Sequence, residues 1–360
     1  MAVIEILASG RIDDRDSAFP STVQLPNGDI LCSFSVGDGP AVSGGTDIAR
    51  STDNGQTWTV ESTILATTSS PATSNSLKLS LSPDGATIYA YGARGYKDPD
   101  APNPRDRVIC KSTDGGHTWS PPHIVPMPVD EMPGVSHGAL PLPSGRLLAP
   151  AVLLPPGRLG ERNIASISDD GGETWNDYAV VFEDPDKKKG FLEIKLTHIP
   201  SGPVMATAWT SSLEGGPDEP NSFALSYDDG TTWSGPTSTG IMGQTMSAVP
   251  LGNDKLLLVY VRRYGEQGII AALAKFTAES WTLHAETTIY DPNASRDAEG
   301  ADSGWDEWAS FEFGFPTAIT LNDGTHLATH WSKENGKFGV SWTRLRTSFW
   351  YSAGLAKGKD

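Results

Sequence analysis

One eight-residue pattern occurs four times along this 360-residue chain, and it limits the possible folds more than any other feature. Its form is Ser-x-Asp-x-Gly-x-Thr-Trp. The copies are STDNGQTW (51–58), STDGGHTW (112–119), SDDGGETW (168–175) and SYDDGTTW (226–233). Their last glycines, at positions 55, 116, 172 and 230, are 61, 56 and 58 residues apart. A regular period of this size predicts a chain built from repeated structural units.

A second repeat alternates with the first. It consists of an alternating apolar segment, a turn rich in Gly, Pro, Asn or Asp, and another alternating segment, which is the pattern of a β-hairpin. Its six copies span residues 19–34, 76–91, 136–151, 193–208, 245–260 and 315–330. Each unit therefore holds two hairpins, and the second hairpin carries the eight-residue pattern.

Four antiparallel strands per unit, repeated six times, predict an all-β fold, a six-bladed β-propeller. We expect residues 1–360 to form one such domain. The fifth and sixth eight-residue patterns have degenerated, near residues 275–283 and 338–346. Because the last unit is one strand short, we expect the N-terminal segment Val3–Leu7 to supply that strand and close the ring.

Charge and composition exclude several classes of protein. The net charge of −17, from 44 acidic and 27 basic residues, argues against nucleic acid or an anionic membrane as partner. No apolar run approaches the ~18 residues of a membrane helix. The N-terminal segment does not resemble a secretory signal, which predicts a cytoplasmic protein, or a secreted one whose leader has been removed. Cys32 and Cys110 are predicted to be buried free thiols, and no spacing indicates a metal site or a cofactor.

The repeated pattern resembles the Asp-box of the sialidase superfamily, and the resemblance covers nearly the whole chain. It supports the six-bladed propeller and implies a carbohydrate ligand. The box aspartates Asp53, Asp114, Asp170 and Asp228 look like catalytic acids, but Asp and Thr side chains also bond the backbone of tight turns. We therefore interpret these four aspartates as structural.

Strand direction predicts which residues meet at one end of the ring. Both hairpin turns of a blade lie at the same end, so the starts of first strands and the ends of second strands gather at the other. In the superfamily that other end is the active face. Glu193 begins an inner strand there, between Leu192 and Ile194, and is the first catalytic candidate. The further catalytic candidates on this face are Asp38, Asp47 and His137.

The chain departs from true sialidases at three positions. The arginine that grips the substrate carboxylate opens blade one in an Arg-Ile-Pro sequence, where this chain has Ala18, Phe19 and Pro20. The tyrosine nucleophile is replaced by Phe315. The glutamate of blade four aligns with Glu193, whereas the arginine expected after it falls near Trp209. The resemblance therefore predicts an enzyme that is not an ordinary sialidase and is closer to the exo-arabinanases, which use two carboxylates on neutral sugars.

We accordingly predict an exo-acting glycoside hydrolase with an oligosaccharide or glycoside as substrate. Glu193 would be nucleophile or base, and Asp38 or Asp47 the general acid. His137 and several arginines would orient the sugar, and two tryptophans would stack on it. The predicted substrate-binding residues are Arg15, Arg94, Trp209, Arg262, Glu312 and Trp331.

Two other functions fit the same residues. A polysaccharide lyase acting on a uronate-containing glycan would use His137 or Tyr264 to remove a proton and arginines to neutralise the carboxylate. A non-catalytic propeller would bind glycan or protein without turnover. The longest irregular segment, residues 291–310, is expected to lie over the pocket, because it joins an outer strand to the next inner strand.

Overall fold

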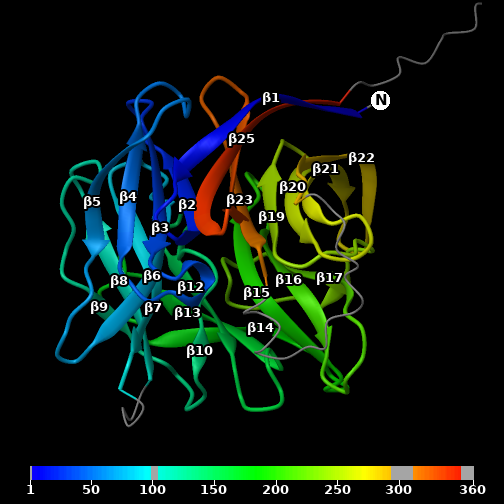
Figure 1. Cartoon of the computed structure of the whole chain (residues 1–360). Helices are drawn as coiled ribbons and strands as arrows, with labels where there is room; N and C mark the ends of the chain where they lie inside the picture. Colours follow the sequence, from blue (N-terminus) through cyan, green and yellow to red (C-terminus); the bar gives the residue numbers. More distant parts are fainter. Residues whose placement is uncertain (1, 99–103, 293–310, 350–360) are drawn as a thin grey trace, which may run out of the picture.

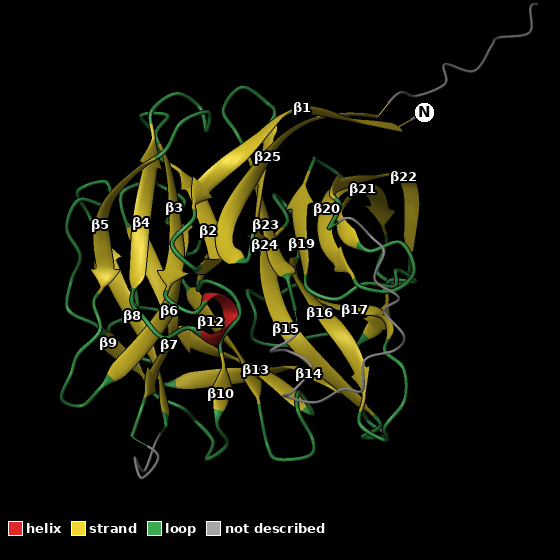
Figure 2. Ribbon diagram, viewed as in Figure 1, coloured by secondary structure: helices red, strands yellow, loops and turns green. Residues whose placement is uncertain are grey.

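The computed structural model describes residues 2–98, 104–292 and 311–349. These residues form six antiparallel sheets that follow one another around a ring, in the colour order of Figure 1. Strands dominate the ribbon in Figure 2, and a helical turn, η1 (Gly39–Ala41), lies near the middle of the ring. The predicted six-bladed β-propeller is confirmed.

In blades 1, 2, 4 and 5 the strands follow one another in chain order across the sheet. Blade 1 comprises β2 (Ser17–Gln24), β3 (Ile30–Val36), β4 (Thr46–Ser51) and β5 (Thr59–Leu65). Blade 2 comprises β6 (Thr73–Leu81), β7 (Ile88–Tyr96), β8 (Arg105–Ser112) and β9 (His123–Val125). Blade 3 comprises β10 (Pro133–Gly134), β11 (Leu140–Pro141), β12 (Leu147–Leu153), β13 (Arg162–Ser168) and β14 (Asp177–Glu183). In this blade the two short strands β10 and β11 both pair with β12.

The other three blades follow the same plan. Blade 4 comprises β15 (Lys189–His198), β16 (Val204–Ser212), β17 (Glu219–Ser226) and β18 (Thr237–Ser238). Blade 5 comprises β19 (Met246–Pro250), β20 (Lys255–Arg262), β21 (Gly268–Phe276) and β22 (Trp281–Tyr290). Blade 6 comprises β23 (Phe313–Thr320), β24 (His326–Glu334), β25 (Lys337–Phe349) and the N-terminal strand β1 (Ala2–Asp13), which is added outside β25.

The ring is closed by the N-terminal strand, as predicted. β1 pairs antiparallel with β25, from Ala2 opposite Phe349 to Asp13 opposite Val340. Figure 1 shows the two strands side by side, blue against red. The first and last parts of the chain therefore share one sheet, which joins the two ends of the propeller.

The four intact boxes form tight turns held by their own polar side chains. In the first box, Asp53 accepts hydrogen bonds from the Thr57 amide and hydroxyl at 2.8 and 2.6 Å and from the Ser51 hydroxyl at 2.8 Å. The Ser51 hydroxyl accepts the amide of Gly55, whose φ of +86° suits glycine. The same bonds recur at Asp114, Asp170 and Asp228. The structural interpretation of the box aspartates is thus confirmed.

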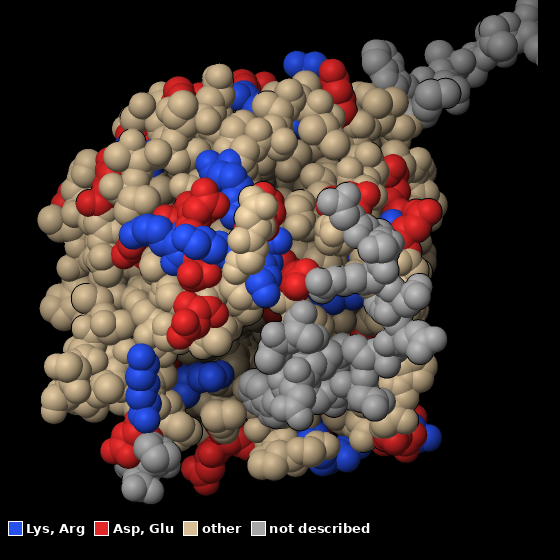
Figure 3. Space-filling model, in the orientation of Figure 1, with Lys and Arg blue, Asp and Glu red and all other residues tan. Residues whose placement is uncertain are grey.

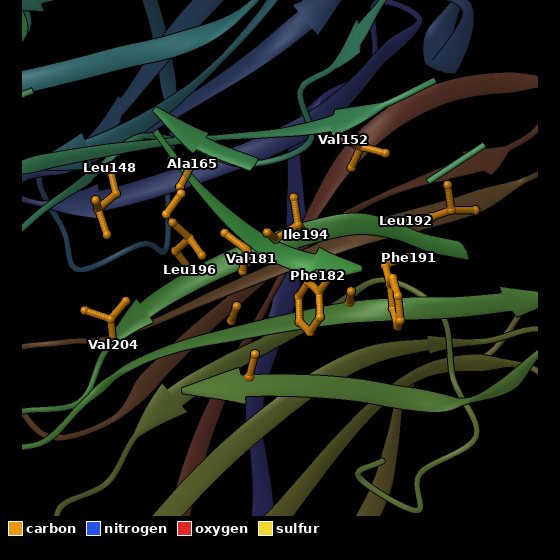
Figure 4. Close-up of a cluster of buried hydrophobic side chains, with 14 of the residues drawn as sticks. Leu148, Val152, Ala165, Val181, Phe182, Phe191, Leu192, Ile194, Leu196 and Val204 are labelled. Atoms are coloured by element: carbon orange, nitrogen blue, oxygen red, sulfur yellow. The ribbon is translucent and has the colours of Figure 1, made fainter. Parts of the chain in front are cut away.

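Apolar side chains fill the space between neighbouring blades. Figure 4 shows the cluster between blades 3 and 4, where Phe182 of β14 stacks on Phe191 of β15 with ring centroids 5.1 Å apart. Leu192 and Ile194 of β15 belong to the same cluster and are buried. Full burial of such a side chain stabilises the fold by about 1.5–3 kcal/mol, so the strand that carries Glu193 is firmly anchored.

Three smaller features bear on the sequence predictions. Cys32 and Cys110 are buried free thiols, as expected. Among the described residues, no helix combines the length and the apolar character that crossing a membrane requires. Residues 293–310, most of the predicted loop over the pocket, lie outside the described residues.

Candidate active site

The inner strands of blades 1, 4 and 6 share a local distortion. Their pairing registers shift between Ala18 and Ser21, between Leu192 and Lys195, and between Gly314 and Thr317. Each shift contains a residue other than glycine at positive φ: Phe19 (56°), Glu193 (51°) and Phe315 (48°). Such backbone is uncommon for these residue types, and bulges of this kind redirect a side chain.

The three redirected side chains meet at one cavity of about 280 Å³ near the ring axis. Every blade contributes to its lining, and so do Pro40 and Ala41 of η1 and the following Val42. The volume is close to the lower end of the range for small-molecule sites, about 300–1,000 Å³. Figure 3 shows basic and acidic side chains interspersed around the middle of the face in view. The cavity suits a small polar ligand such as one sugar unit.

Glu193 supplies the negative charge of the cavity. Within residues 2–98, 104–292 and 311–349, it is the one Asp or Glu that lines it. Burial raises the pKa of the Glu193 carboxyl, while the nearby positive charges of Lys195, Arg263 and Lys78 oppose that rise. A half-buried carboxyl with opposed influences of this kind is typical of a group that exchanges protons or attacks a substrate.

Two buried lysines lie close to this carboxyl. Lys78 lines the cavity, with its ammonium 5.3 and 5.5 Å from the ring centroids of Phe19 and Phe315. Lys195 donates to the Ser247 hydroxyl at 3.0 Å and to the carbonyl of Pro316. Burial lowers the pKa of each lysine to about 7. Both amines can therefore change protonation state near neutral pH.

His137 lies on the segment between β10 and β11, next to the cavity-lining Ser136. Burial, together with the charges of Lys195 and Lys78, lowers the pKa of His137 to about 3. The imidazole is therefore neutral at physiological pH. The Ser136 hydroxyl donates to the carbonyl of Ile194 at 3.2 Å, which links this segment to the strand of Glu193.

One wall of the cavity is held by a polar network between blades 4 and 5. The Trp209 indole donates to Asp218 at 2.6 Å, and the Tyr264 hydroxyl donates to the same carboxylate. Gln244 donates to Tyr264 at 3.2 Å and accepts a hydrogen bond from Arg263. Burial raises the pKa of Asp218 and of Tyr264. The network fixes the cavity-lining Trp209 and Arg263.

Arg263 is held from a second side as well. Its guanidinium donates to the carbonyl of Phe313 and lies 3.6 Å from the ring centroid of Phe311. Arg263, Arg105 and Lys78 are the described cationic residues of the lining. Arg105 is half-buried, and burial lowers its pKa. A cavity with these charges can hold a sugar hydroxyl, a carboxylate or a developing negative charge.

The structure brings together some of the residues predicted from sequence. Glu193, Trp209 and Trp331 line the cavity. Trp331 packs against Phe19, with ring centroids 6.2 Å apart. Glu312 follows the lining residue Phe311, and its carbonyl accepts the amide of Lys333 at 2.6 Å.

The other predicted residues are not among those that line the cavity. Asp47 accepts hydrogen bonds from Thr63 at 2.7 Å and Arg15 at 3.0 Å, and Arg15 also pairs with Asp13 at 2.6 Å. Asp38 precedes η1 with a φ of 56°. Their catalytic and binding roles stay predictions.

The two remaining arginines are engaged at their own blades. Arg94 pairs with Asp106 at 2.8 Å in blade 2. Arg262 pairs with Glu286 at 2.6 Å in blade 5 and donates to the carbonyl of Glu266 at 2.7 Å. Within the described part of the chain, no three or more His, Cys, Asp or Glu side chains are grouped as metal ligands.

Sequence reasoning missed several residues of the cavity. Lys78 could have been found by the signal that identified Glu193, because it too stands between aliphatic residues on an inner strand. Arg263 is adjacent to the predicted Arg262, and strand alternation decides which of the two turns inward. Asp218 lies in a loop and reaches the site only through the fold.

Comparison with known proteins agrees with this architecture. A protein of unknown function from Dyadobacter fermentans has a TM-score of 0.74 and 23% identity, over 96% of this chain and 99% of that chain. The NanB sialidase from Streptococcus pneumoniae has a TM-score of 0.67 and 12% identity, over 95% and 70%. An α-L-arabinanase from Penicillium chrysogenum, complexed with arabinobiose, has a TM-score of 0.64 and 17% identity, over 94% and 98%.

At these identities the likeness establishes the six-bladed propeller fold alone. A sequence comparison with curated proteins finds no match. A family model described as "BNR repeat-like domain" matches residues 97–328, which is more than half of the chain. The chain therefore belongs to the BNR repeat-like domain family.

Proposed function

We propose that this protein is an exo-acting glycoside hydrolase that takes one terminal sugar into the axial cavity, with Glu193 as its catalytic carboxylate. The observation that carries the proposal is the placement of Glu193 at positive φ in a bulge facing that cavity. Backbone of this kind costs on the order of 1–3 kcal/mol and persists where the surroundings impose it, most often at functional sites. Buried Leu192 and Ile194 impose it here.

Glu193 acts as the nucleophile or base at the anomeric carbon. Burial raises the pKa of Glu193, and the nearby cations, which favour its ionised form, oppose part of that rise. Arg263 and Arg105 hold hydroxyl or carboxylate groups of the sugar, while Trp209 and Trp331 provide apolar walls for the ring. The general acid predicted from sequence, Asp38 or Asp47, would have to reach the glycosidic oxygen from outside the described lining.

The direct test is turnover of a panel of aryl glycosides and oligosaccharides by the wild type and by Glu193→Gln. We expect Glu193→Gln to lower kcat/KM by at least about 100-fold while sugar binding persists. Glu183→Gln, which changes an exposed carboxylate on the outer strand β14, is the matched control and should leave turnover unchanged. A wild-type protein that binds a sugar of the panel but turns over none of them would contradict the proposal and indicate a binding propeller.

A second function, lyase action on a uronate-containing glycan, is favoured by one specific observation. Lys78, with a pKa lowered to about 7 by burial, lines the same cavity as Arg105 and Arg263. A neutral amine removes a proton readily, and arginines can neutralise the uronate carboxylate. Elimination would give an unsaturated product that absorbs ultraviolet light, whereas hydrolysis would give saturated sugars only.

A further inference from the structure

We propose that Lys78 is the proton donor that works with Glu193 in this cavity. The inference rests on the proposed hydrolase function and assigns its general acid. Lys78 is on the inner strand β6 of blade 2, is 3% exposed and lines the cavity. Glu193 enters the same cavity from blade 4, so a sugar placed between them would contact both groups.

The hydrogen bonds of Lys78 leave it able to contact a ligand. Its ammonium donates to the hydroxyl and the carbonyl of Ser76, at 2.8 and 3.3 Å, both in its own strand. An ammonium has three donors, so a third N–H remains for an acceptor in the cavity. Among the ion pairs between described residues, none involves Lys78. The flanking rings of Phe19 and Phe315 limit its movement.

Lys195, the other buried lysine, is not suited to this role. Its ammonium donates to Ser247 of β19 and to the Pro316 carbonyl of β23, so it ties three inner strands together. It is also absent from the described lining of the cavity. We therefore assign Lys195 to positioning and to the charge balance of Glu193, and Lys78 to contact with substrate.

The charged groups around Lys78 support proton donation at neutral pH. Glu193 of β15 favours the ammonium, Arg105 of β8 disfavours it, and Lys195 and His137 face the same space. Burial is the largest influence and brings the pKa of Lys78 to about 7. An ordinary lysine, with a pKa near 10.4, holds its proton too tightly to be an efficient acid at that pH.

The reaction balances with these two groups and one water. The Glu193 carboxylate attacks the anomeric carbon, the bond to the glycosidic oxygen breaks, and the Lys78 ammonium gives its proton to the departing oxygen. The neutral amine then takes a proton from water, whose oxygen attacks the anomeric carbon and releases Glu193 as a carboxylate. Both side chains return to their starting states, and one glycosidic bond has been hydrolysed.

The test compares leaving groups and pH profiles. A nitrophenyl glycoside needs no proton on departure, whereas an alkyl glycoside or a disaccharide does. We expect Lys78→Met to lower kcat/KM by at least about 100-fold on the alkyl glycoside and by far less on the nitrophenyl glycoside. A lysine that only supports the fold would lower both equally. Lys337→Met, at an exposed lysine of β25, is the control and should change neither.

The wild type gives a readout that does not depend on folding of the variant. Its kcat/KM on the alkyl glycoside should fall as pH rises above about 7, where Lys78 loses its proton. Lys78→Arg keeps the charge but cannot release a proton near neutral pH, so this fall should disappear and the residual rate should be low.

Three outcomes would overturn the assignment. The first is that the wild type turns over both substrates and that Lys78→Met lowers kcat/KM equally on the alkyl glycoside and on the nitrophenyl glycoside. The second is an unsaturated product, since Lys78 would then remove a proton rather than donate one. The third is absence of turnover by the wild type on the whole panel, which would remove the proposed hydrolase function together with this assignment. The first outcome leaves the hydrolase function standing, so the two failures are distinguishable.

Discussion

Charged side chains border the cavity at inner-strand positions whose neighbours are aliphatic. Glu193 and Lys78 each stand between two buried residues, namely Leu192 and Ile194 on β15 and Leu77 and Leu79 on β6. A charge in such a place costs folding free energy unless an opposite charge, a hydrogen bond or a ligand compensates. The two opposite charges at one cavity reduce that cost, and both remain where an entering ligand would meet them.

The charge of Lys195 should set the acidic limit of activity. Its attraction lowers the pKa of Glu193, so Lys195→Met removes that attraction and the pKa of Glu193 rises. Because the nucleophile must be ionised, the acidic limb of the kcat/KM profile should move to higher pH, and kcat/KM at pH values below that limb should fall several-fold. Lys195→Arg, which keeps the charge, is the control. An acidic limb that is unmoved in Lys195→Met would show that Lys195 does not influence the ionisation that limits activity.

The sequence predicted that Glu193 faces the cavity, but it did not predict the residues that surround Glu193 there. Glu193 was identified because a charge interrupts an apolar inner strand at the predicted active face. Asp47 was predicted from its place in a loop after a second strand, but it lies on the third strand β4, where Arg15 and Thr63 bind it. The direction of a loop side chain depends on contacts with residues far away in the chain, and alternation along a strand does not reveal them.

The box turn that joins the third and fourth strands of a blade is held together by hydrogen bonds among its own residues. Asp53 is half-buried, and its hydrogen bonds with Thr57, Ser51 and Gln56 all lie within the turn that joins β4 to β5. The same turn contains Trp58, whose indole donates to the carbonyl of Gly55 at 3.1 Å. The turn therefore fixes how two outer strands meet, at a distance from the cavity-lining residues.

Asp53→Ala should lower thermal stability and leave turnover intact. The loss of these bonds should lower the midpoint of thermal unfolding by roughly 3 °C or more, measured by scanning calorimetry, while kcat/KM stays at the wild-type value. The Thr57 bonds lower the pKa of Asp53 to about 2. The stabilisation is therefore fully present above pH ~4, the pKa of an unfolded aspartate, and is lost as pH falls from there through the folded-state pKa of about 2. Equal stability of the variant and the wild type at pH 7 would contradict the structural role.

The hairpins were predictable because turn residues and alternation act over a few neighbouring positions. The bulges in the inner strands could not be predicted in this way, because a shift of register depends on how the strand packs against the other inner strands around the ring axis. The same applies to blade 3, where one inner strand was expected from residue 136 but β10 and β11 are separated. A Cβ at Gly138 would lie 3.0 Å from the carbonyl oxygen of Leu79, which shows that this segment approaches blade 2 instead of continuing its own sheet.

The lining of the cavity is mainly cationic, whereas the chain as a whole is strongly acidic. The net charge is −17, whereas the described cavity lining carries Lys78, Arg105 and Arg263 against Glu193. The field at long range therefore disfavours an anionic glycan, while the cavity favours an anionic group at contact. If the proposed hydrolase function holds, we expect its substrates to be neutral or weakly anionic sugars, because both conditions permit these.

Closure of the ring should govern the stability of the whole molecule. β1 pairs with β25 along its length, and Ile12 is buried in a cluster that joins blade 6 to blade 1 through Ile30, Phe34 and Val340. Arg11 adds hydrogen bonds to the hydroxyls of Ser332 and Ser341, at 2.9 and 2.8 Å. Without β1, the outer edge of β25 and the junction between the first and last blades would be exposed.

Deletion of residues 2–13 should accordingly lower the midpoint of thermal unfolding by more than about 5 °C. A single transition should remain, since each blade is packed against two neighbours and the ring unfolds as a unit. Ile6→Ser, which changes a β1 side chain that is 45% exposed, keeps the strand and should have little effect. Ile12→Ala should fall between the two, because it removes a buried side chain but leaves the pairing with β25. A calorimetric midpoint that stays at the wild-type value after the deletion would contradict this prediction. It would show that the pairing of β1 with β25 does not contribute to the stability of the ring.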